Sequence, residues 1–209
     1  MCIGILGQKI GMTQIFDENG LAVPVTIIKA GPCSITQVKT MESDGYNAIQ
    51  IGYLEKPAKI AKKSEIGHFD KSGSKPFRFT KEYKVENPDE KSLGEKVTVT
   101  NFAIGQYLDV SARTIGKGFA GLQKRHNFSR GPMTHGSKNH RLPGSIGAGT
   151  TPGRVLPGKK MAGHLGNKIT TIKNIEVIGI HEEENLLILK GSIQGKPGNL
   201  ISLKPSVKV

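Results

Sequence analysis

Acidic residues are absent from one long stretch of this chain. From Val110 to Ile175 there is no Asp or Glu, although the chain carries 17 of them in all. Within this stretch, residues 111–168 hold 11 of the 30 Lys and Arg residues and 12 of the 27 glycines. Nearly all of the formal net charge of +13 is therefore found there. Since a carboxylate would repel a polyanion, this composition indicates a segment that lies against nucleic-acid phosphate.

Cysteines, long apolar runs and export signals are also scarce. The two cysteines, Cys2 and Cys33, allow at most one disulfide, and neither belongs to a Cys-x-x-Cys pair. We therefore expect no disulfide scaffold, no zinc site and a reducing compartment. No apolar run approaches the length of a membrane span, and no signal-peptide segment precedes the strand-like run Ile3–Phe16. We therefore expect no membrane partner. We also expect either that nothing targets the protein elsewhere or that it is made where it works.

The basic segment is poor in core-forming side chains. Only nine of the 58 residues from 111 to 168 are Leu, Ile, Val or Phe. Burial of so little apolar surface does not offset the entropy of ordering a segment with a net charge of +11. We expect it to be unstructured alone and ordered by a partner. A flexible linker is the alternative interpretation, but linkers seldom concentrate charge of one sign.

Strand-like patterns lie on both sides of the basic segment. Runs rich in β-branched residues, bounded by turn signals, are Ala22–Lys29, Ser34–Lys39, Asn47–Tyr53, Ile175–Ile180, Leu186–Lys190 and Leu200–Leu203. Short strands at this spacing predict a mainly β fold, with a small barrel or strongly curled sheet. Short helices are predicted at Ser64–Lys71 and Phe119–His126.

These patterns predict how the chain divides. Residues 1–110 and 169–209 are expected to form one β domain built from both chain ends. Within it, residues 55–96 are expected to be a polar insertion. Residues 111–168 are expected to project from this domain as an extension.

Two glycine-rich motifs resemble nucleotide-binding loops. Gly116–Gly121 (GKGFAG) matches G-x-G-x-x-G, but no acidic residue follows for more than 50 positions and no βαβ pattern surrounds it. Gly153–Lys160 (GRVLPGKK) nearly matches the phosphate-binding loop, but lacks the final Ser or Thr and an aspartate for magnesium. We therefore expect no nucleotide cofactor, no small-molecule substrate and no enzymatic activity.

The four histidines of the segment do not form a metal-binding pattern. His126, His135, His140 and His164 have spacings that place no two imidazoles on one helix face, and no carboxylate or thiolate is nearby. Zinc can in principle take histidines alone, so a metal site stays a minor alternative. A catalytic triad fails as well, because nothing acidic would orient a histidine. Hydrogen bonds to phosphates, or stacking on bases, suit these side chains better.

Glycines and cations together favour binding to folded RNA. Glycine lets the backbone approach a nucleic acid closely, and arginine makes bidentate phosphate contacts. With only Phe119 and Phe128 as aromatics, the segment is no single-strand stacking platform, and it has no continuous helix for the DNA major groove. The predicted contacts are Lys117, Lys124, Arg125, His126, Arg130, His135, Lys138, His140, Arg141, Arg154, Lys159, Lys160 and Lys168. An architectural DNA-binding protein and a phosphate-handling enzyme remain as rival hypotheses.

The chain resembles the universal L-three family of large-subunit ribosomal proteins. The resemblance is carried by Gly4–Phe16 (GILGQKIGMTQIF), Gly116–Phe128 (GKGFAGLQKRHNF), Thr134–Asn167 (THGSKNHRLPGSIGAGTTPGRVLPGKKMAGHLGN) and Asn185–Ile201 (NLLILKGSIQGKPGNLI). The runs GPCSITQVKT and NAIQIGY are similar to cyanobacterial and chloroplast members. The resemblance implies that the protein is located in the large ribosomal subunit. The chloroplast stroma is the favoured compartment, and the bacterial cytoplasm is the alternative.

The family implies a β-barrel body of the type shared with translation factors. It also implies a long, mostly irregular extension that passes through 23S-type rRNA towards the peptidyl transferase centre. Its tip would be Gly144, Ser145, Ile146, Gly147, Ala148, Gly149, Thr150, Thr151, Pro152 and Gly153. Members join early in assembly, bind near the 3′ end of the rRNA and lie beside large-subunit proteins fourteen and nineteen. Some bacterial members carry a methylated glutamine where this chain has Thr150, so that modification is not expected here.

Overall fold

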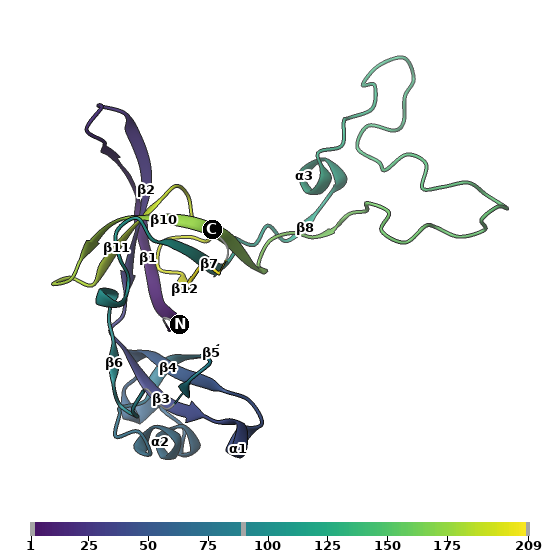
Figure 1. Ribbon diagram of the computed structural model, residues 1–209. Helices are drawn as coiled ribbons and strands as arrows, with labels where there is room; N and C mark the ends of the chain where they lie inside the picture. Colours follow the sequence, from purple (N-terminus) through teal and green to yellow (C-terminus); the bar gives the residue numbers. More distant parts are fainter. Residues whose placement is uncertain (1–2, 89–90, 208–209) are drawn as a thin grey trace. The chain divides into compact units, whose positions relative to one another are not determined.

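The computed structural model describes residues 3–88 and 91–207, which separate into two compact units (Figure 1). One unit, here called the body, combines the chain up to Arg113 with the chain from Ile169 onward. The other unit, here called the arm, is Thr114–Lys168. Each unit is described by itself.

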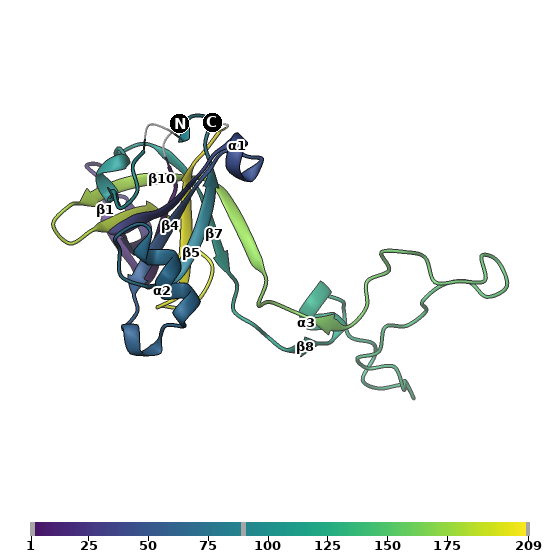
Figure 2. The same ribbon diagram turned by 90° about the horizontal axis from the view of Figure 1, so that it is seen from below.

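A closed antiparallel barrel forms the larger part of the body (Figure 2). Its strands follow one another around the barrel in the order β1-β12-β7-β10-β11-β2. Their bounds are β1 Ile5–Phe16, β2 Ala22–Ala30, β7 Tyr107–Arg113, β10 Ile169–His181, β11 Leu186–Lys190 and β12 Leu200–Pro205. Strands from the two parts of the chain are interleaved, because β12 pairs with both β1 and β7. The predicted mainly β fold is confirmed.

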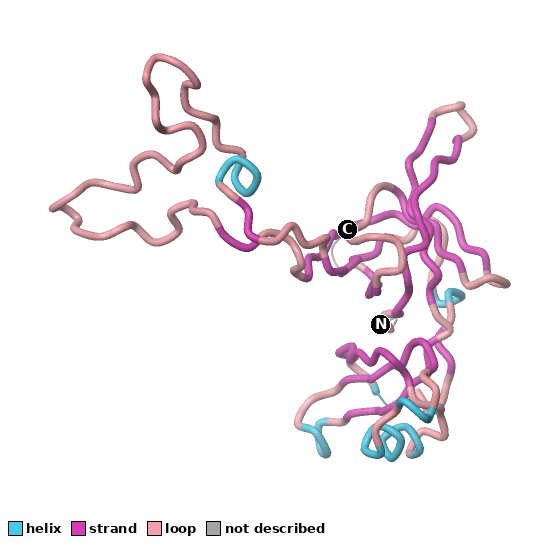
Figure 3. Tube along the Cα trace, turned by 180° about the vertical axis from the view of Figure 1, so that it is seen from behind, coloured by secondary structure: helices cyan, strands magenta, loops and turns pink. Residues whose placement is uncertain are grey.

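A second antiparallel sheet of the body lies beside the barrel strands (Figure 3). Its strand order is β5-β4-β3-β6. Its strands are β3 Cys33–Lys39, β4 Ala48–Glu55, β5 Phe77–Lys84 and β6 Lys96–Val97. It is accompanied by α1 Met41–Asp44, α2 Lys63–Asp70 and 3-10 turns at Ala58–Ile60 and Val99–Asn101. No helix in the described ranges is long and apolar enough to cross a membrane.

This second sheet differs from the sequence-based prediction. The runs Ser34–Lys39 and Asn47–Tyr53 were expected in the barrel, but they pair with each other and with β5 instead. Within residues 55–96, α2 lies at the predicted helix Ser64–Lys71, whereas the strand β5 was not predicted. Strand β5 (FRFTKEYK) buries only Tyr83, and such an edge strand gives little alternating signal to detect.

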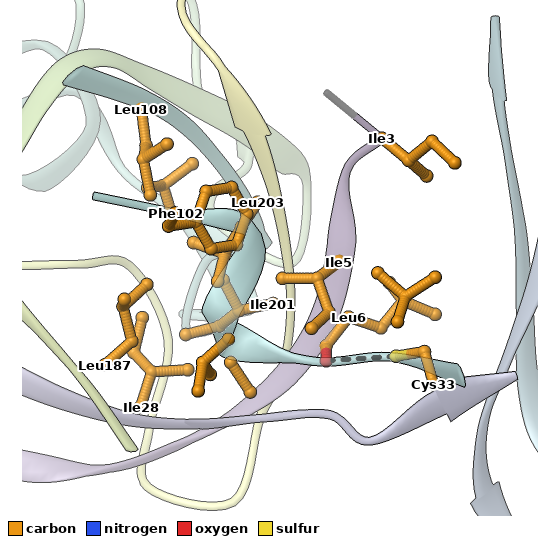
Figure 4. Close-up of a cluster of buried hydrophobic side chains, with 14 of the residues drawn as sticks. Ile3, Ile5, Leu6, Ile28, Cys33, Phe102, Leu108, Leu187, Ile201 and Leu203 are labelled. Carbon is orange, nitrogen blue, oxygen red and sulfur yellow. Dashed lines mark hydrogen bonds between the residues drawn. The ribbon is translucent and has the colours of Figure 1, made fainter. Parts of the chain in front are cut away.

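The body core is built from branched aliphatic side chains that the strands direct inward. Ile5, Ile28, Leu108, Leu187 and Leu203 are fully buried in one cluster that the barrel shares with the second sheet (Figure 4). Each such side chain stabilises the fold by about 1.5–3 kcal/mol relative to an exposed one. The body therefore carries a core of its own.

Cys33 belongs to the same core. Its thiol donates to the carbonyl of Leu6 across 3.5 Å, and burial raises the pKa of Cys33 to about 12. A thiol held protonated in this way is a poor nucleophile and metal ligand. Cys2, the other cysteine of the chain, lies outside the described residues.

Tyr83 connects the second sheet to the barrel by hydrogen bonds. Its buried hydroxyl donates to the carbonyl of Ile5 (3.2 Å) and lies 2.7 Å from the hydroxyl of Ser202. Burial raises the pKa of Tyr83 well above its usual value, so the group stays a neutral donor.

The Tyr83→Phe substitution is expected to lower the free energy of unfolding by about 1–3 kcal/mol, because it removes two buried hydrogen bonds. Urea unfolding measures this change. Tyr107→Phe is the control, since the Tyr107 hydroxyl makes no hydrogen bond within the described ranges and lies partly exposed. Equal effects of the two substitutions would contradict the role given to Tyr83.

Candidate nucleic-acid interface

The base of the arm is a pair of antiparallel limbs. Strand β8 (Phe119–Ala120) pairs with β9 (Gly163–His164). Closer to the first and last residues of the arm, the amide of Lys117 donates to the carbonyl of Leu165 (2.8 Å). The amide of Thr114 donates to the carbonyl of Lys168 (2.9 Å). Glycine allows this close approach, because a Cβ at Gly166 would collide with the carbonyl of Ile115. The entry and exit limbs therefore lie side by side.

A single-turn helix, α3 (Leu122–His126), follows β8. It begins later than the predicted helix at Phe119, because Phe119 and Ala120 are used in strand pairing. Arg125 Nη1 donates to the carbonyl of Met161 (2.6 Å), and a ring nitrogen of His126 lies 3.2 Å from the same oxygen. These two predicted phosphate contacts thus also tie the helix to the returning limb.

Beyond α3 the chain forms two successive irregular loops (Figure 1). The first is closed by a backbone hydrogen bond, in which the amide of Gly131 donates to the carbonyl of His140 (3.1 Å). The imidazole of His140 also lies in this loop, with Nδ1 2.9 Å from the carbonyl of Pro132. Gly131 has no space for a side chain, because a Cβ there would collide with the carbonyl of Asn139. His140 is therefore a partly buried part of this loop.

The second loop, residues 141–160, is exposed at every position. It contains the predicted tip, Gly144–Gly153. Its backbone hydrogen bonds are local, such as the amide of Gly153 donating to Gly149 (3.1 Å). A loop of this kind presents its backbone amides and side chains to a partner rather than to a core of its own.

Most of the predicted cationic contacts lie exposed on the arm. Arg125, His126 and His140 are partly buried. The exposed ones are Lys117, Lys124, Arg130, His135, Lys138, Arg141, Arg154, Lys159, Lys160 and Lys168. Because the arm contains no carboxylate, no charge within it neutralises them. The arm therefore has a strongly positive potential along its whole length.

One candidate contact was missed by sequence reasoning. Phe119 is 81% exposed and lies directly opposite His164 in the β8–β9 pair, so both rings stand on the same face. Together they offer a flat surface on which a base can stack. Only the strand register brings the two residues together, and no sequence pattern indicates that register.

A basic cleft of about 420 Å³ on the body was also missed. Its lining includes Lys81, Lys84, Ser202 and Lys204, and also one carboxylate, Glu82, which pairs with Lys39 (2.9 Å). Lys81 Nζ donates to Ser202 Oγ (2.8 Å), and burial together with the charge of Lys204 lowers the pKa of Lys81. Lys204 lies 3.8 Å from Asp109, whereas no carboxylate in the described ranges pairs with Lys81. The alternation of side chains along a strand could have placed Ser202 and Lys204 on one face of the sheet. Surface lysines are too common, however, for this pattern to indicate a binding site.

The profile of the family described as "Ribosomal protein L3" matches residues 55–188. The chain is also 59% identical to the large ribosomal subunit protein uL3c of Phaeodactylum tricornutum over 206 residues, covering 99% of this chain and all of the relative. The chain belongs to the ribosomal protein L3 family. Its predicted membership in this family is confirmed.

Other relatives of the family agree in length and identity. The uL3c protein of Emiliania huxleyi is 60% identical over 207 residues, covering 99% of this chain and all of the relative. A uL3 protein of a Synechococcus species is 59% identical over 209 residues, covering all of this chain and 98% of the relative. Plastid and cyanobacterial forms are thus among the relatives, as predicted. These relatives are named as proteins of the large ribosomal subunit, and the predicted class, a ribosomal protein rather than an enzyme, is confirmed.

The two nucleotide-like motifs have ordinary positions in the arm. Gly116–Gly121 runs through the antiparallel β8 limb and leads into a helix of five residues, unlike the βαβ unit that holds a dinucleotide. Gly153–Lys160 lies in the irregular second loop, with no strand before it and no helix after it. Within the described part of the chain, no three His, Cys, Asp or Glu side chains are grouped to hold a metal ion.

In the protein without RNA, the base of the arm is expected to be ordered and the second loop unprotected. The amides of Lys117 and Leu165 are paired across the limbs, whereas residues 141–160 bury nothing. Hydrogen exchange of the full-length protein should show at least about tenfold protection at the base and almost none in the second loop. Protection of residues 141–160 equal to that of the barrel strands would contradict the view that RNA orders this loop.

Proposed function

We propose that the arm binds 23S-type rRNA, and that the chain acts as a structural constituent of the large ribosomal subunit. The observation that carries this proposal is the exposure of the arm cations in a segment that contains no acidic residue. Arginines such as Arg130 and Arg141 suit bidentate phosphate contacts, and lysines such as Lys138 act as point charges. Their effect is to neutralise phosphates of converging rRNA segments so that these segments pack.

The predicted tip has the properties of a support rather than a catalyst. Residues 144–153 contain no titratable side chain, so they have no group for acid–base chemistry. The shorter limb, from Gly149 back to Gly163, limits the reach of the tip beyond the base to on the order of 50 Å. The family resemblance of Pro143–Asn167 supports the placement of this tip near the peptidyl transferase centre.

The same resemblance supports the remaining parts of the proposal. The body would bind near the 3′ end of the rRNA during early assembly, with large-subunit proteins fourteen and nineteen as neighbours. The basic cleft at Lys81 and Lys204 offers an additional phosphate contact on the body. The similarity to plastid and cyanobacterial relatives supports a plastid or bacterial ribosome.

DNA binding is the rival that charge alone would permit. The arm offers no recognition helix, since α3 has only five residues, and irregular loops suit the shape of folded RNA better than a regular duplex. Competition of duplex DNA against structured rRNA at one salt concentration distinguishes the two functions.

Crosslink mapping in assembled particles tests the proposed function directly. The tagged chain should sediment with the large subunit, and photo-crosslinks from residues 140–151 should reach 23S-type rRNA around the peptidyl transferase centre. A photo-crosslinker at Ile60, an exposed residue of the body, serves as the control and should give a different set of crosslinks. Exclusion of the chain from the particles, or crosslinks only to distant rRNA domains, would overturn the proposal.

A further inference from the structure

One hairpin of the body has the opposite composition to the arm. Residues 10–28 contain no Lys, Arg or His, in a chain with 30 Lys and Arg residues. The only charged residues in this run are Asp17 and Glu18, which lie in its turn. Lys9 precedes the run, but it is buried and its Nζ donates to the carbonyls of Ile193 (2.6 Å) and Gly195 (3.2 Å). Lys29, which follows the run, is exposed at the inner end of β2. The outer part of the hairpin, residues 10–24, therefore presents no cation to a phosphate.

The outer part of this hairpin, residues 10–24, is here called the β1–β2 ribbon. Its strands stay paired to the turn, with Gln14 opposite Pro24 and Phe16 opposite Ala22. The inner halves of β1 and β2 line the core, whereas the ribbon continues beyond the barrel strands (Figures 1 and 3). Four large apolar side chains are at least about half exposed along it: Ile10 (49%), Met12 (50%), Phe16 (66%) and Leu21 (64%).

Such a ribbon is unfavourable when it is left in water. A two-stranded ribbon without a covering layer is marginally stable, and exposed apolar side chains grouped in one element mark an interaction site. Phosphate does not suit this site, because Asp17 and Glu18 would repel it and no cation offsets them. An apolar protein surface with cations at its edge is complementary to both features.

We propose that the β1–β2 ribbon docks onto another protein of the particle. The partner surface would be an apolar groove for Met12, Phe16 and Leu21, with Lys or Arg side chains placed to meet Asp17 and Glu18. The inference goes beyond rRNA binding and rests on the proposed function only in taking the partner from the large subunit. The body thus meets protein at the ribbon, whereas the arm meets RNA.

Site-specific photo-crosslinking in purified large-subunit particles tests this proposal. A benzophenone side chain at Phe16 should crosslink to a protein other than this chain, at a peptide that contains Lys or Arg. The same probe at Ile146, in the arm tip, reports separately on the proposed function by its crosslinks to rRNA. Crosslinks from Phe16 to rRNA alone, to a second copy of this chain, or to nothing would overturn the proposal.

Substitutions show whether apolar contact and charge both contribute. With the probe moved to Leu21, Met12→Ser/Phe16→Ser and, separately, Asp17→Lys/Glu18→Lys should each lower the protein crosslink about tenfold. The control is Ile60→Ser/Leu93→Ser, which removes equally exposed apolar side chains elsewhere on the body. It should leave the crosslink unchanged, and equal losses in all three variants would contradict specific docking.

Discussion

Replacement of Lys117–Lys160 by a short linker is expected to lower rRNA affinity by at least about 100-fold and to leave the body folded. The deletion removes nine of the 30 Lys and Arg residues and the whole of both irregular loops. The body keeps its core, because the buried cluster around Ile5, Leu108 and Leu203 contains no arm residue. The two limbs lie side by side at the base, so a short linker can close the gap.

Filter binding at one salt concentration measures the affinity, and urea unfolding measures the stability of the body. A matched control replaces the exposed body segment 58–62, between β4 and α2, with a linker of the same composition. This control should keep its rRNA affinity. An unchanged affinity of the arm deletion would refute the proposed function of the arm, while an unfolded deletion variant would show that the body depends on the arm.

The division of the chain into a β body and a basic segment could be predicted from its composition. Exclusion of carboxylates from residues 110–175 can be seen in the sequence alone, and the cause that we propose for it, repulsion from phosphate, is independent of fold. Barrel strands such as Ala22–Ala30 and Leu186–Lys190 were also predictable, because runs of β-branched and aliphatic residues between turn signals are typical of strands.

Pairing between distant segments was not accessible in the same way. Strands β3 and β4 have the same residue pattern whether they join the barrel or a separate sheet, and the choice depends on the polar edge strand β5. Similarly, the hydrogen bond from Arg125 to Met161 and the Phe119–His164 pair depend on the register of the two limbs. Charge pattern predicts what the arm binds, but register decides which side chains are free to bind it.

The salt dependence of rRNA binding should be steep for the intact protein. If about half of the arm cations contact phosphates, a plot of log affinity against log salt has a slope on the order of −4 to −5. Substitution of Arg130, Lys138 and Arg141 by Gln should weaken binding and make this slope shallower by about 2 to 3. The reason is that binding of the variant neutralises fewer phosphates and so releases fewer counterions. All three side chains are exposed and lie in the irregular part of the arm beyond α3, so no core is disturbed.

The control for this variant makes the same change in net charge on the body. Lys59, Lys63 and Lys71 are exposed around α2, and their substitution by Gln removes three charges from outside the arm. If phosphate contact is local to the arm, the body variant keeps a slope within about 1 of the intact protein, since screened charges beyond about 10 Å contribute little in 0.1 M salt. Equal changes in slope for the two variants would mean that the chain attracts rRNA by its overall charge. A change confined to the arm variant would instead assign the contacts to the segment that excludes carboxylates.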